Sequence, residues 1–183
     1  MGKITFILGG ARSGKSSHAL RLAEESGKPV AFIATAQAFD DEMSVRIEKH
    51  KAERPAHWKT LEITREIAPH VSRVETEIVV LDCVTLLVSN LLMQFIEDDR
   101  AHEAPFMQAA QREIEELIAA IRHSSQHWII VSNEVGLGLV PSYQMGRVYR
   151  DGLGWANQRL ARAADDVLWM VAGIPVPIGI YRY

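Results

Sequence analysis

The sequence lacks the features that would place it in a membrane, in an oxidising compartment or on nucleic acid. Its single cysteine, Cys83, cannot form a disulfide within the chain, which favours a reducing compartment such as the cytoplasm. No apolar run approaches the roughly 18 to 20 residues of a membrane span, and the chain starts on a strand pattern without a secretory signal. The formal net charge of −3 is too small to favour a polyanionic partner. We therefore expect a cytoplasmic protein with neither stable membrane insertion nor a nucleic-acid partner.

What the sequence contains is typical of one globular domain. Of its 183 residues, 48% are hydrophobic and 23% are charged, which is enough apolar material for a single domain over residues 1–183. Strongly apolar stretches alternate with segments of helical periodicity, which predicts an α/β domain with a mostly parallel central sheet flanked by helices. The strand-like stretches are residues 3–8, 30–35, 77–82, 128–132, 167–171 and 176–181. The last two are expected to pair as an antiparallel edge around residues 173–175, and residues 97–100 are expected to form a charged surface break.

A phosphate-binding motif lies near the start of the chain. It reads Gly9-Gly10-Ala11-Arg12-Ser13-Gly14-Lys15-Ser16, which matches the Walker A pattern G-x-x-x-x-G-K-[ST] between an apolar strand and a helix. The glycines allow a tight turn whose backbone N–H groups point at phosphate oxygens, beside the positive end of the following helix. Lys15 is expected to reach the β- and γ-phosphates, and the Ser16 hydroxyl to bind Mg²⁺. The motif predicts that the chain binds a nucleoside triphosphate.

Further polar residues follow predicted strands and are expected at the same sheet edge, because ligands bind at the carboxyl ends of parallel strands. Asp82 is placed as a Walker B carboxylate that would hold Mg²⁺, although an aspartate there can instead cap the next helix. Asn133 and Glu134 are candidates for contacting substrate or water, and Glu134 is the candidate general base. Glu62 ends a shorter strand and reads equally as a ligand contact or as an ordinary surface carboxylate.

Residues 40–54 are predicted to form a helix with a basic face. Arg46, His50 and Arg54 recur at every fourth position, with Lys51 beside them. A neutral imidazole among cations is suited to attack a phosphorus atom whose oxygens those cations bind. The spacing alone favours the simpler interpretation, a solvated basic face that pairs with acidic residues of the same segment (Glu42, Glu48 and Glu53).

Several segments together resemble one family. They are Gly-Gly-Ala-Arg-Ser-Gly-Lys-Ser at 9–16, Ile-Ala-Thr-Ala at 33–36, the region from Asp-Asp-Glu-Met to His-Trp at 40–58, Asn-Glu-Val-Gly-Leu-Gly-Leu-Val-Pro at 133–141 and Asn-Gln-Arg-Leu-Ala at 157–161. The set resembles the bifunctional adenosylcobinamide kinase/adenosylcobinamide-phosphate guanylyltransferases of cobalamin biosynthesis. The resemblance extends over nearly the whole chain, and the segments at 40–58 and 133–141 are specific to that family rather than to P-loop proteins at large.

The resemblance implies two reactions and a set of site residues. ATP or GTP would phosphorylate the hydroxyl of the aminopropanol arm of adenosylcobinamide, and GTP would then transfer GMP to that phosphate through a GMP-histidine intermediate. The histidine that matches the family pattern is His50, whereas Lys49 stands where a relative has a second histidine. The implied nucleotide contacts are residues 9–16, Ala34, Thr35, Ala36, Lys51, Ala52, Glu53, Arg54, Glu62 and Val84. The resemblance also implies a RecA-like P-loop core and a homotrimer.

Two other functions are compatible with the Walker A motif. One is a plain P-loop small-molecule kinase without guanylyl transfer, and the other is a nucleotide-gated regulatory protein. The sequence has no N-K-x-D guanine motif, which counts against a GTPase switch. His50 separates the alternatives, because only the transferase needs it as a nucleophile. The sequence does not locate the corrinoid pocket, for which residues 97–105 and 141–149 are the candidate walls.

Overall fold

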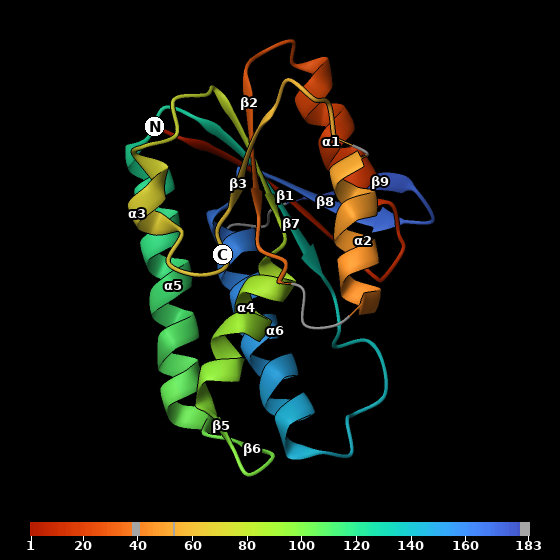
Figure 1. Cartoon of the computed structure of the whole chain (residues 1–183), viewed down its shortest axis with the longest axis vertical. Coiled ribbons are helices and arrows are strands. Elements are labelled where there is room, and N and C mark those ends of the chain that lie inside the picture. Colours follow the sequence, from red (N-terminus) through yellow and green to blue (C-terminus); the bar gives the residue numbers. More distant parts are fainter. Residues whose placement is uncertain (38–40, 53, 180–183) are drawn as a thin grey trace.

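The computed structural model describes residues 1–37, 41–52 and 54–179, without the side chains of Glu42, Met43, Arg46 and His50. The described residues form a seven-stranded sheet with helices on both faces (Figure 1). The helices are α1 (Lys15–Glu25), α2 (Asp41–Ala52), α3 (Ala68–Val71), α4 (Val84–Leu92), the short 3-10 helix η1 (Met93–Phe95), α5 (Glu103–His123) and α6 (Gln144–Ala163). No described helix combines the length and the hydropathy that a membrane crossing needs.

The main sheet has the strand order β3-β2-β4-β7-β1-β8-β9. Its strands are β1 (Lys3–Gly9), β2 (Val30–Ala34), β3 (Lys59–Glu62), β4 (Ile78–Asp82), β7 (His127–Asn133), β8 (Asp166–Val171) and β9 (Ile174–Ile178). All neighbouring strands are parallel except β8 and β9, which are antiparallel. The α/β class, the mostly parallel sheet and the antiparallel C-terminal edge are therefore confirmed. One strand, β7, separates β1, which leads into the Walker A loop, from β4, which ends in Asp82.

The sheet separates two apolar layers. Successive side chains of a strand point to opposite faces, so in β1 Phe6 and Ile7 belong to different clusters. Phe6 packs in the larger cluster with residues of α4, α5 and α6, such as Leu87 and Leu153, whereas Ile7 packs with Ala19 of α1. The helices thus cover both faces of the sheet (Figure 1).

The charged surface break predicted at residues 97–100 is an exposed hairpin turn, whereas the β8–β9 turn lies at other residues than predicted. The charged break at residues 97–100 belongs to a small hairpin of β5 (Ile96–Glu97) and β6 (Arg100–Ala101). Its turn residues Asp98 and Asp99 have φ of 48° and 59°, as a two-residue hairpin turn requires, and aspartate tolerates this region better than most residues. The β8–β9 turn is likewise Ala172-Gly173, with φ of 50° and 83°, rather than residues 173–175. Pro175 instead lies within β9, because an edge strand tolerates proline.

Candidate active site

The Walker A loop lies between the end of β1 and the start of α1, at the carboxyl edge of the sheet (Figure 1). Gly14 precedes α1 with a φ of 92°, a conformation that L side chains rarely adopt, so this turn requires glycine. Arg12 is also left-handed, with a φ of 56°, and the Ser13 N–H donates to the Gly10 carbonyl at 3.4 Å. The loop therefore curls in front of the first turn of α1, whose free N–H groups and positive end favour an anion.

Lys15 lies across this loop. Its ammonium donates to the Gly10 carbonyl at 2.5 Å and lies 3.4 Å from Ser13 Oγ, and the residue is only 7% exposed. Burial lowers the pKa of the Lys15 ammonium, and the charges of Cys83 and Asp82 act in the opposite direction. Because these hydrogen bonds go to neutral oxygens, the buried cation favours an anionic ligand in the loop.

The β8–β9 hairpin supports the loop from the side. The Gly173 N–H donates to the Ser13 carbonyl at 2.9 Å. A Cβ atom at Gly14 would come within 3.2 Å of Gly173 Cα, and one at Gly9 within 2.6 Å of the Met170 carbonyl oxygen. Gly9 and Gly14 thus pack closely against the hairpin, and the contact at Gly9 leaves no room for a side chain.

Asp82 ends β4 at the same edge and is half-buried. Its charge acts on Lys15 and on Arg54, raising the pKa of each against the larger effect of burial, so the three groups lie near one another. The Ser16 hydroxyl, in the first turn of α1, is also half-buried. A carboxylate and a hydroxyl are oxygen donors that suit Mg²⁺, which in proteins often takes only one or two side chains besides phosphates and water. The chemistry of these two donors therefore fits the predicted metal.

Thr35 joins the ends of β2 and β4. It is fully buried, its hydroxyl donates to the Cys83 carbonyl at 2.7 Å and accepts the Cys83 N–H at 2.8 Å, and its carbonyl accepts a bond from Asn90 at 2.8 Å. Burial raises the pKa of the Cys83 thiol to about 12, so the thiol stays protonated at neutral pH and is no nucleophile. Thr35 was expected as a nucleotide contact; its side chain is engaged within the protein, where it positions the segment that follows Asp82.

Arg54 lies over Phe32 of β2. The guanidinium carbon is 3.8 Å from the ring centroid, a cation–π geometry. Burial lowers the pKa of Arg54, against the charges of Asp82 and Glu62. Its Nε and Nη1 are buried and have no hydrogen-bond partner among the described residues. A buried donor without a partner costs about 1–3 kcal/mol, and more when it is charged, so this position favours an anionic ligand.

Helix α2 contains the segment for which a basic face is predicted, and Lys51 in its last turn pairs with Glu62 of β3. Lys51 Nζ lies 3.0 Å from Glu62 Oε1 and 3.4 Å from Glu48 Oε1, and hydrogen bonding to Glu62 is the main cause that raises the Lys51 pKa. The Glu48 pair is what a solvated basic face would show, whereas the Glu62 pair holds the end of α2 at the carboxyl edge. His50 belongs to this last turn, but its side chain and the whole of Glu53 lie outside the described residues.

Side chains from α4 and α6 hold the end of β7 beside the Walker A loop. The Asn133 N–H donates to Thr85 Oγ1 at 2.7 Å, and the Asn133 carbonyl accepts a bond from Asn157 Nδ2 at 3.0 Å. The next residue, Glu134, donates its N–H to the Gly9 carbonyl at 3.0 Å. The candidate base Glu134 is therefore brought next to the phosphate-binding loop, as its place after a central strand predicts.

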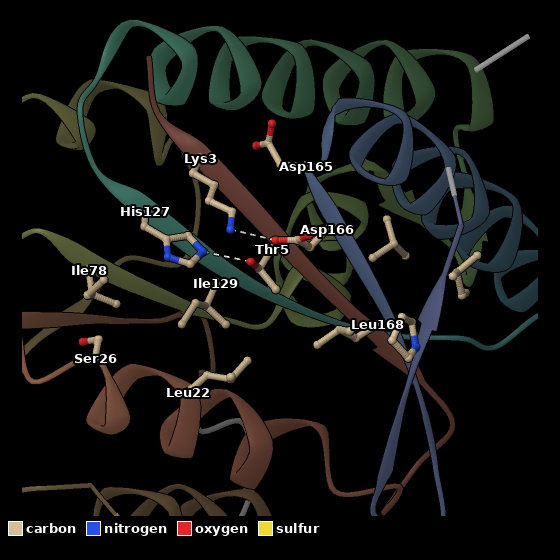
Figure 2. A pocket seen from close by; sticks show the side chains of 13 residues that line it. Lys3, Thr5, Leu22, Ser26, Ile78, His127, Ile129, Asp165, Asp166 and Leu168 are labelled. Carbon is tan, nitrogen blue, oxygen red and sulfur yellow. Dashed lines mark hydrogen bonds and ion pairs between the residues drawn. The ribbon is translucent and has the colours of Figure 1, made fainter. Parts of the chain in front are cut away.

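A separate hollow of about 620 Å³ lies at the opposite, amino edge of the sheet (Figure 2). Four of its polar side chains form two pairs: Lys3 Nζ lies 2.8 Å from Asp166 Oδ2, and Thr5 Oγ1 lies 2.8 Å from His127 Nε2. None of the residues that line this hollow belongs to the Walker A loop or to the segments around Asp82. The candidate site is therefore the carboxyl edge, where parallel sheets bind their ligands.

Comparison with known families identifies this arrangement. The family described as "Cobinamide kinase / cobinamide phosphate guanyltransferase" matches residues 5–178. The chain belongs to this family. The match to the cobinamide kinase family includes every part of the site described above, from the Walker A loop to the β8–β9 hairpin.

Three curated proteins are similar to this member of the cobinamide kinase family over nearly its whole length. It is 43% identical over 177 residues to the "Bifunctional adenosylcobalamin biosynthesis protein CobU" of Escherichia coli, with 94% of this chain and 97% of that protein covered. It is 45% identical over 175 residues to the CobP protein of the same description from Pseudomonas aeruginosa, covering 94% and 95%. It is 42% identical over 183 residues to the CobU protein of Salmonella typhimurium, covering 94% and 97%.

Two solved structures resemble this chain more distantly. The KaiC-like protein PH0186 of Pyrococcus horikoshii has a TM-score of 0.47 and 13% identity, over 92% of this chain and 70% of that one. The RadB recombinase has a TM-score of 0.48 and 17% identity, over 92% and 74%. At these scores neither likeness bears on the function of this chain.

The residues expected in the cobinamide kinase site fall into two groups. Loop residues 9–16, Asp82, Arg54, Lys51 and Glu62 come from separate parts of the chain and meet at one edge. Ala34 and Val84 are buried beside that edge, Ala36 is half-buried and Ala52 is exposed at the end of α2. Their contacts with a nucleotide stay predictions.

Residues that shape the site from elsewhere in the fold, Phe32, Asn90 and Asn157 among them, were not predicted from the sequence. Phe32 supports Arg54, Asn90 holds the Thr35 carbonyl and Asn157 holds the end of β7. Phe32 and Asn90 reach their partners only through the fold, so no local pattern marks them. Asn157 opens one of the segments that carry the family resemblance, and that was the available signal.

Proposed function

We propose that this chain catalyses both reactions of its family. ATP or GTP phosphorylates the aminopropanol hydroxyl of adenosylcobinamide, and GTP then gives GMP to that phosphate, forming adenosyl-GDP-cobinamide and pyrophosphate. The observation that carries the proposal is that two cations lie near the same carboxylate. The charge of Asp82 acts to raise the pKa both of the Walker A lysine, Lys15, and of Arg54, which follows α2. A plain small-molecule kinase could use both cations on its phosphates, so the two functions differ at His50, in the last turn of α2, which only the transferase needs as a nucleophile.

In the kinase step the Walker A loop and Lys15 bind the β- and γ-phosphates. The acceptor hydroxyl attacks the γ-phosphorus, the bond to the β-phosphate oxygen breaks, and ADP or GDP leaves. The Lys15 cation stabilises the charge that develops on the bridging oxygen. Glu134, held beside Gly9 at the end of β7, is the candidate to accept the proton of the hydroxyl.

In the transferase step His50 acts as the nucleophile. Its imidazole attacks the α-phosphorus of GTP, a P–N bond forms, and the bond to the β-phosphate oxygen breaks so that pyrophosphate leaves. An oxygen of adenosylcobinamide phosphate then attacks the same phosphorus, the P–N bond breaks, and the imidazole is regenerated. Arg54, with two buried donor nitrogens that have no partner among the described residues, donates to the phosphate oxygens. This role rests on the family resemblance and on the place of His50 in the last turn of α2.

Ser16 and Asp82 would hold Mg²⁺, which when bound neutralises charge on the phosphates. The support is the oxygen-donor chemistry of the two side chains at the edge where the Walker A loop lies. The same proposal takes the remaining predicted contacts as parts of the nucleotide site. A homotrimer and a cytoplasmic location are proposed as well, the first from the family resemblance and the second from the composition of the chain.

The proposal is tested by following both products. The purified full chain is incubated with Mg²⁺, adenosylcobinamide and ATP or GTP, and the corrinoids are separated and identified by mass spectrometry. We expect the phosphorylated corrinoid first and adenosyl-GDP-cobinamide once GTP is present. Lys15→Met should slow phosphoryl transfer about 100-fold or more, whereas Lys28→Met, on the exposed surface, should not.

Each other outcome has a definite meaning. Formation of the phosphorylated corrinoid without the GDP product would favour the plain kinase. Formation of neither product, while the chain binds nucleotide, would overturn the proposed function.

A further inference from the structure

The loop between β7 and α6, residues 134–143, is held at both ends. In Figure 1 it is the long teal segment that extends from the end of β7 to the start of α6. At its start the Glu134 carboxylate accepts the N–H of Gly136, in addition to the bond from the Glu134 N–H to the Walker A strand. At its end Arg147 Nη1 donates to the carbonyls of Pro141 and Ser142, at 3.0 and 2.9 Å. The loop thus has a defined place relative to the nucleotide site.

The end of the loop packs closely against the first turn of α6. A Cβ atom at Gly146 would come within 2.7 Å of the Tyr143 ring and within 2.9 Å of Pro141 Cβ. Glycine is therefore required there for Tyr143 and Pro141 to pack on the helix. This contact and the hydrogen bonds of Arg147 together hold the end of the loop against α6.

Between its two anchors the loop presents apolar side chains to solvent. Leu137 is 81% exposed, Leu139 97% and Val140 66%, and Tyr143 beside them is 60% exposed. Residues 135–143 include no charged side chain. Contiguous exposed apolar groups on an ordered segment are unfavourable in water and mark a binding surface.

We propose that Leu137, Leu139, Val140 and Tyr143 form an apolar platform that binds the corrin ring of adenosylcobinamide. The proposal rests on the proposed function, because that function supplies the ligand. The reacting oxygen of this substrate sits on a side arm that must reach the phosphorus atoms at the carboxyl edge. The bulk of the substrate therefore lies within one arm's length of that edge, where this loop begins.

The chemistry of the platform matches this occupant better than a nucleotide. A corrin ring is a large macrocycle with methyl-bearing edges and neutral amide side arms, and it can cover several aliphatic side chains at once. A loop without charged side chains offers phosphate groups no cation, whereas the nucleotide site has the cations of Lys15 and Arg54. Ile178, an exposed apolar residue of β9, is farther from the nucleotide site, because β9 runs from the hairpin turn toward the amino edge, where Ile178 pairs with Val167.

The test compares a doubly substituted chain, Leu137→Asp/Leu139→Asp, with the wild type and with Ile178→Asp as the control at another exposed apolar site. The KM for adenosylcobinamide in the kinase reaction and its equilibrium Kd are measured, with labelling of the chain by α-labelled GTP as a readout that needs no corrinoid. We expect the KM and Kd of the double variant to rise at least tenfold, while GTP labelling stays within twofold. Ile178→Asp should change neither constant, and Leu137→Met/Leu139→Met should keep both near the wild-type values.

Three results would overturn the platform. One is an unchanged Kd for adenosylcobinamide in the double variant. The second is an equal loss of GTP labelling, which would show a general defect of the site. The third is a change in molecular mass in solution that accounts for the loss, which would assign the loop to contacts between copies of the chain. A wild-type chain that binds the corrinoid through this loop but converts nothing would instead sink the proposed function alone.

Discussion

Arg54 combines three properties at the scale of a single residue. It is held over Phe32, it lies in the field of Asp82, and two of its nitrogens are buried without a partner among the described residues. Stacking on the ring fixes the guanidinium plane, so its N–H edges are already oriented before a ligand arrives. These properties suit a group that binds phosphate oxygens.

We predict that Arg54→Lys lowers kcat/KM for GTP in the guanylylation step about tenfold or more, which corresponds to about 1.4 kcal/mol. A lysine keeps the charge but neither stacks on Phe32 in the same way nor offers two N–H groups in one plane. Steady-state kinetics measure the effect, and Arg21→Lys, on the exposed side of α1, is the matched control. If Arg54→Lys and the wild type have the same kcat/KM for GTP, Arg54 does not bind the phosphate oxygens in the way proposed.

At the scale of elements, α5 and the segment before α3 are joined by one buried carboxylate. Glu113 is 7% exposed, and its two oxygens accept the N–H groups of Glu66 and Ile67, each at 2.9 Å. The carboxylate satisfies two backbone donors that would otherwise have no partner as they enter the core. It thereby sets the start of α3 on α5.

We predict that Glu113→Ala lowers the free energy of unfolding by about 2 kcal/mol or more, because two backbone donors lose their acceptor. Glu113→Gln keeps one acceptor oxygen and should cost about half as much. Urea denaturation measures both, with Glu116→Ala on the exposed face of the same helix as control. If Glu113→Ala lowers the free energy of unfolding no more than Glu116→Ala does, water replaces the carboxylate as acceptor at no cost, which would contradict the prediction.

Most elements could be predicted from the sequence because their signals are local. The apolar runs gave the strands, and the Walker A pattern placed the loop between β1 and α1. Asp82 and Glu134 followed from the rule that the ends of parallel strands meet at one edge. The exception at this scale is the β8–β9 turn, which was predicted at residues 173–175 and is formed by Ala172-Gly173 in the left-handed backbone conformation.

The contacts that complete the site could not be predicted in this way. Arg54 reaches Phe32, and Gly173 reaches Ser13, only after the sheet has formed. Neither pair has a spacing in the sequence that marks it. Asn157 and Thr85 hold the end of β7 from two different helices, so their role appears only in the assembled fold.

At the scale of the whole molecule, the two edges of the sheet differ in chemistry. The carboxyl edge gathers cations that favour an anionic ligand, whereas the amino edge pairs its polar groups internally (Figure 2). His127 belongs to the amino edge, where burial lowers its pKa below the ordinary value of 6.5 and the Lys3 charge acts in the same direction. Burial also lowers the pKa of His18.

These histidines give the stability of the molecule a pH dependence. Below about pH 6.5 the unfolded chain binds more protons than the folded chain at His127, so the free energy of unfolding falls as the pH drops from about 7 toward 5. We predict that His127→Gln loses part of this slope, whereas His123→Gln, on the exposed end of α5, keeps it. Urea denaturation at pH 7.5 and pH 5.5 measures the slopes, and an unchanged slope in His127→Gln would contradict the assignment.

The transfer of GMP through His50 is tested most directly by covalent labelling. The full chain is incubated with Mg²⁺ and α-labelled GTP, the protein-bound label is challenged with acid and with alkali, and His50→Ala and His57→Ala are treated in parallel. His57 is an exposed histidine just beyond α2 and serves as the matched control. We predict an acid-labile, alkali-stable label on the wild type and on His57→Ala, and none on His50→Ala. A wild type that binds GTP without becoming labelled, or a label that persists in His50→Ala, would contradict the guanylyltransferase mechanism.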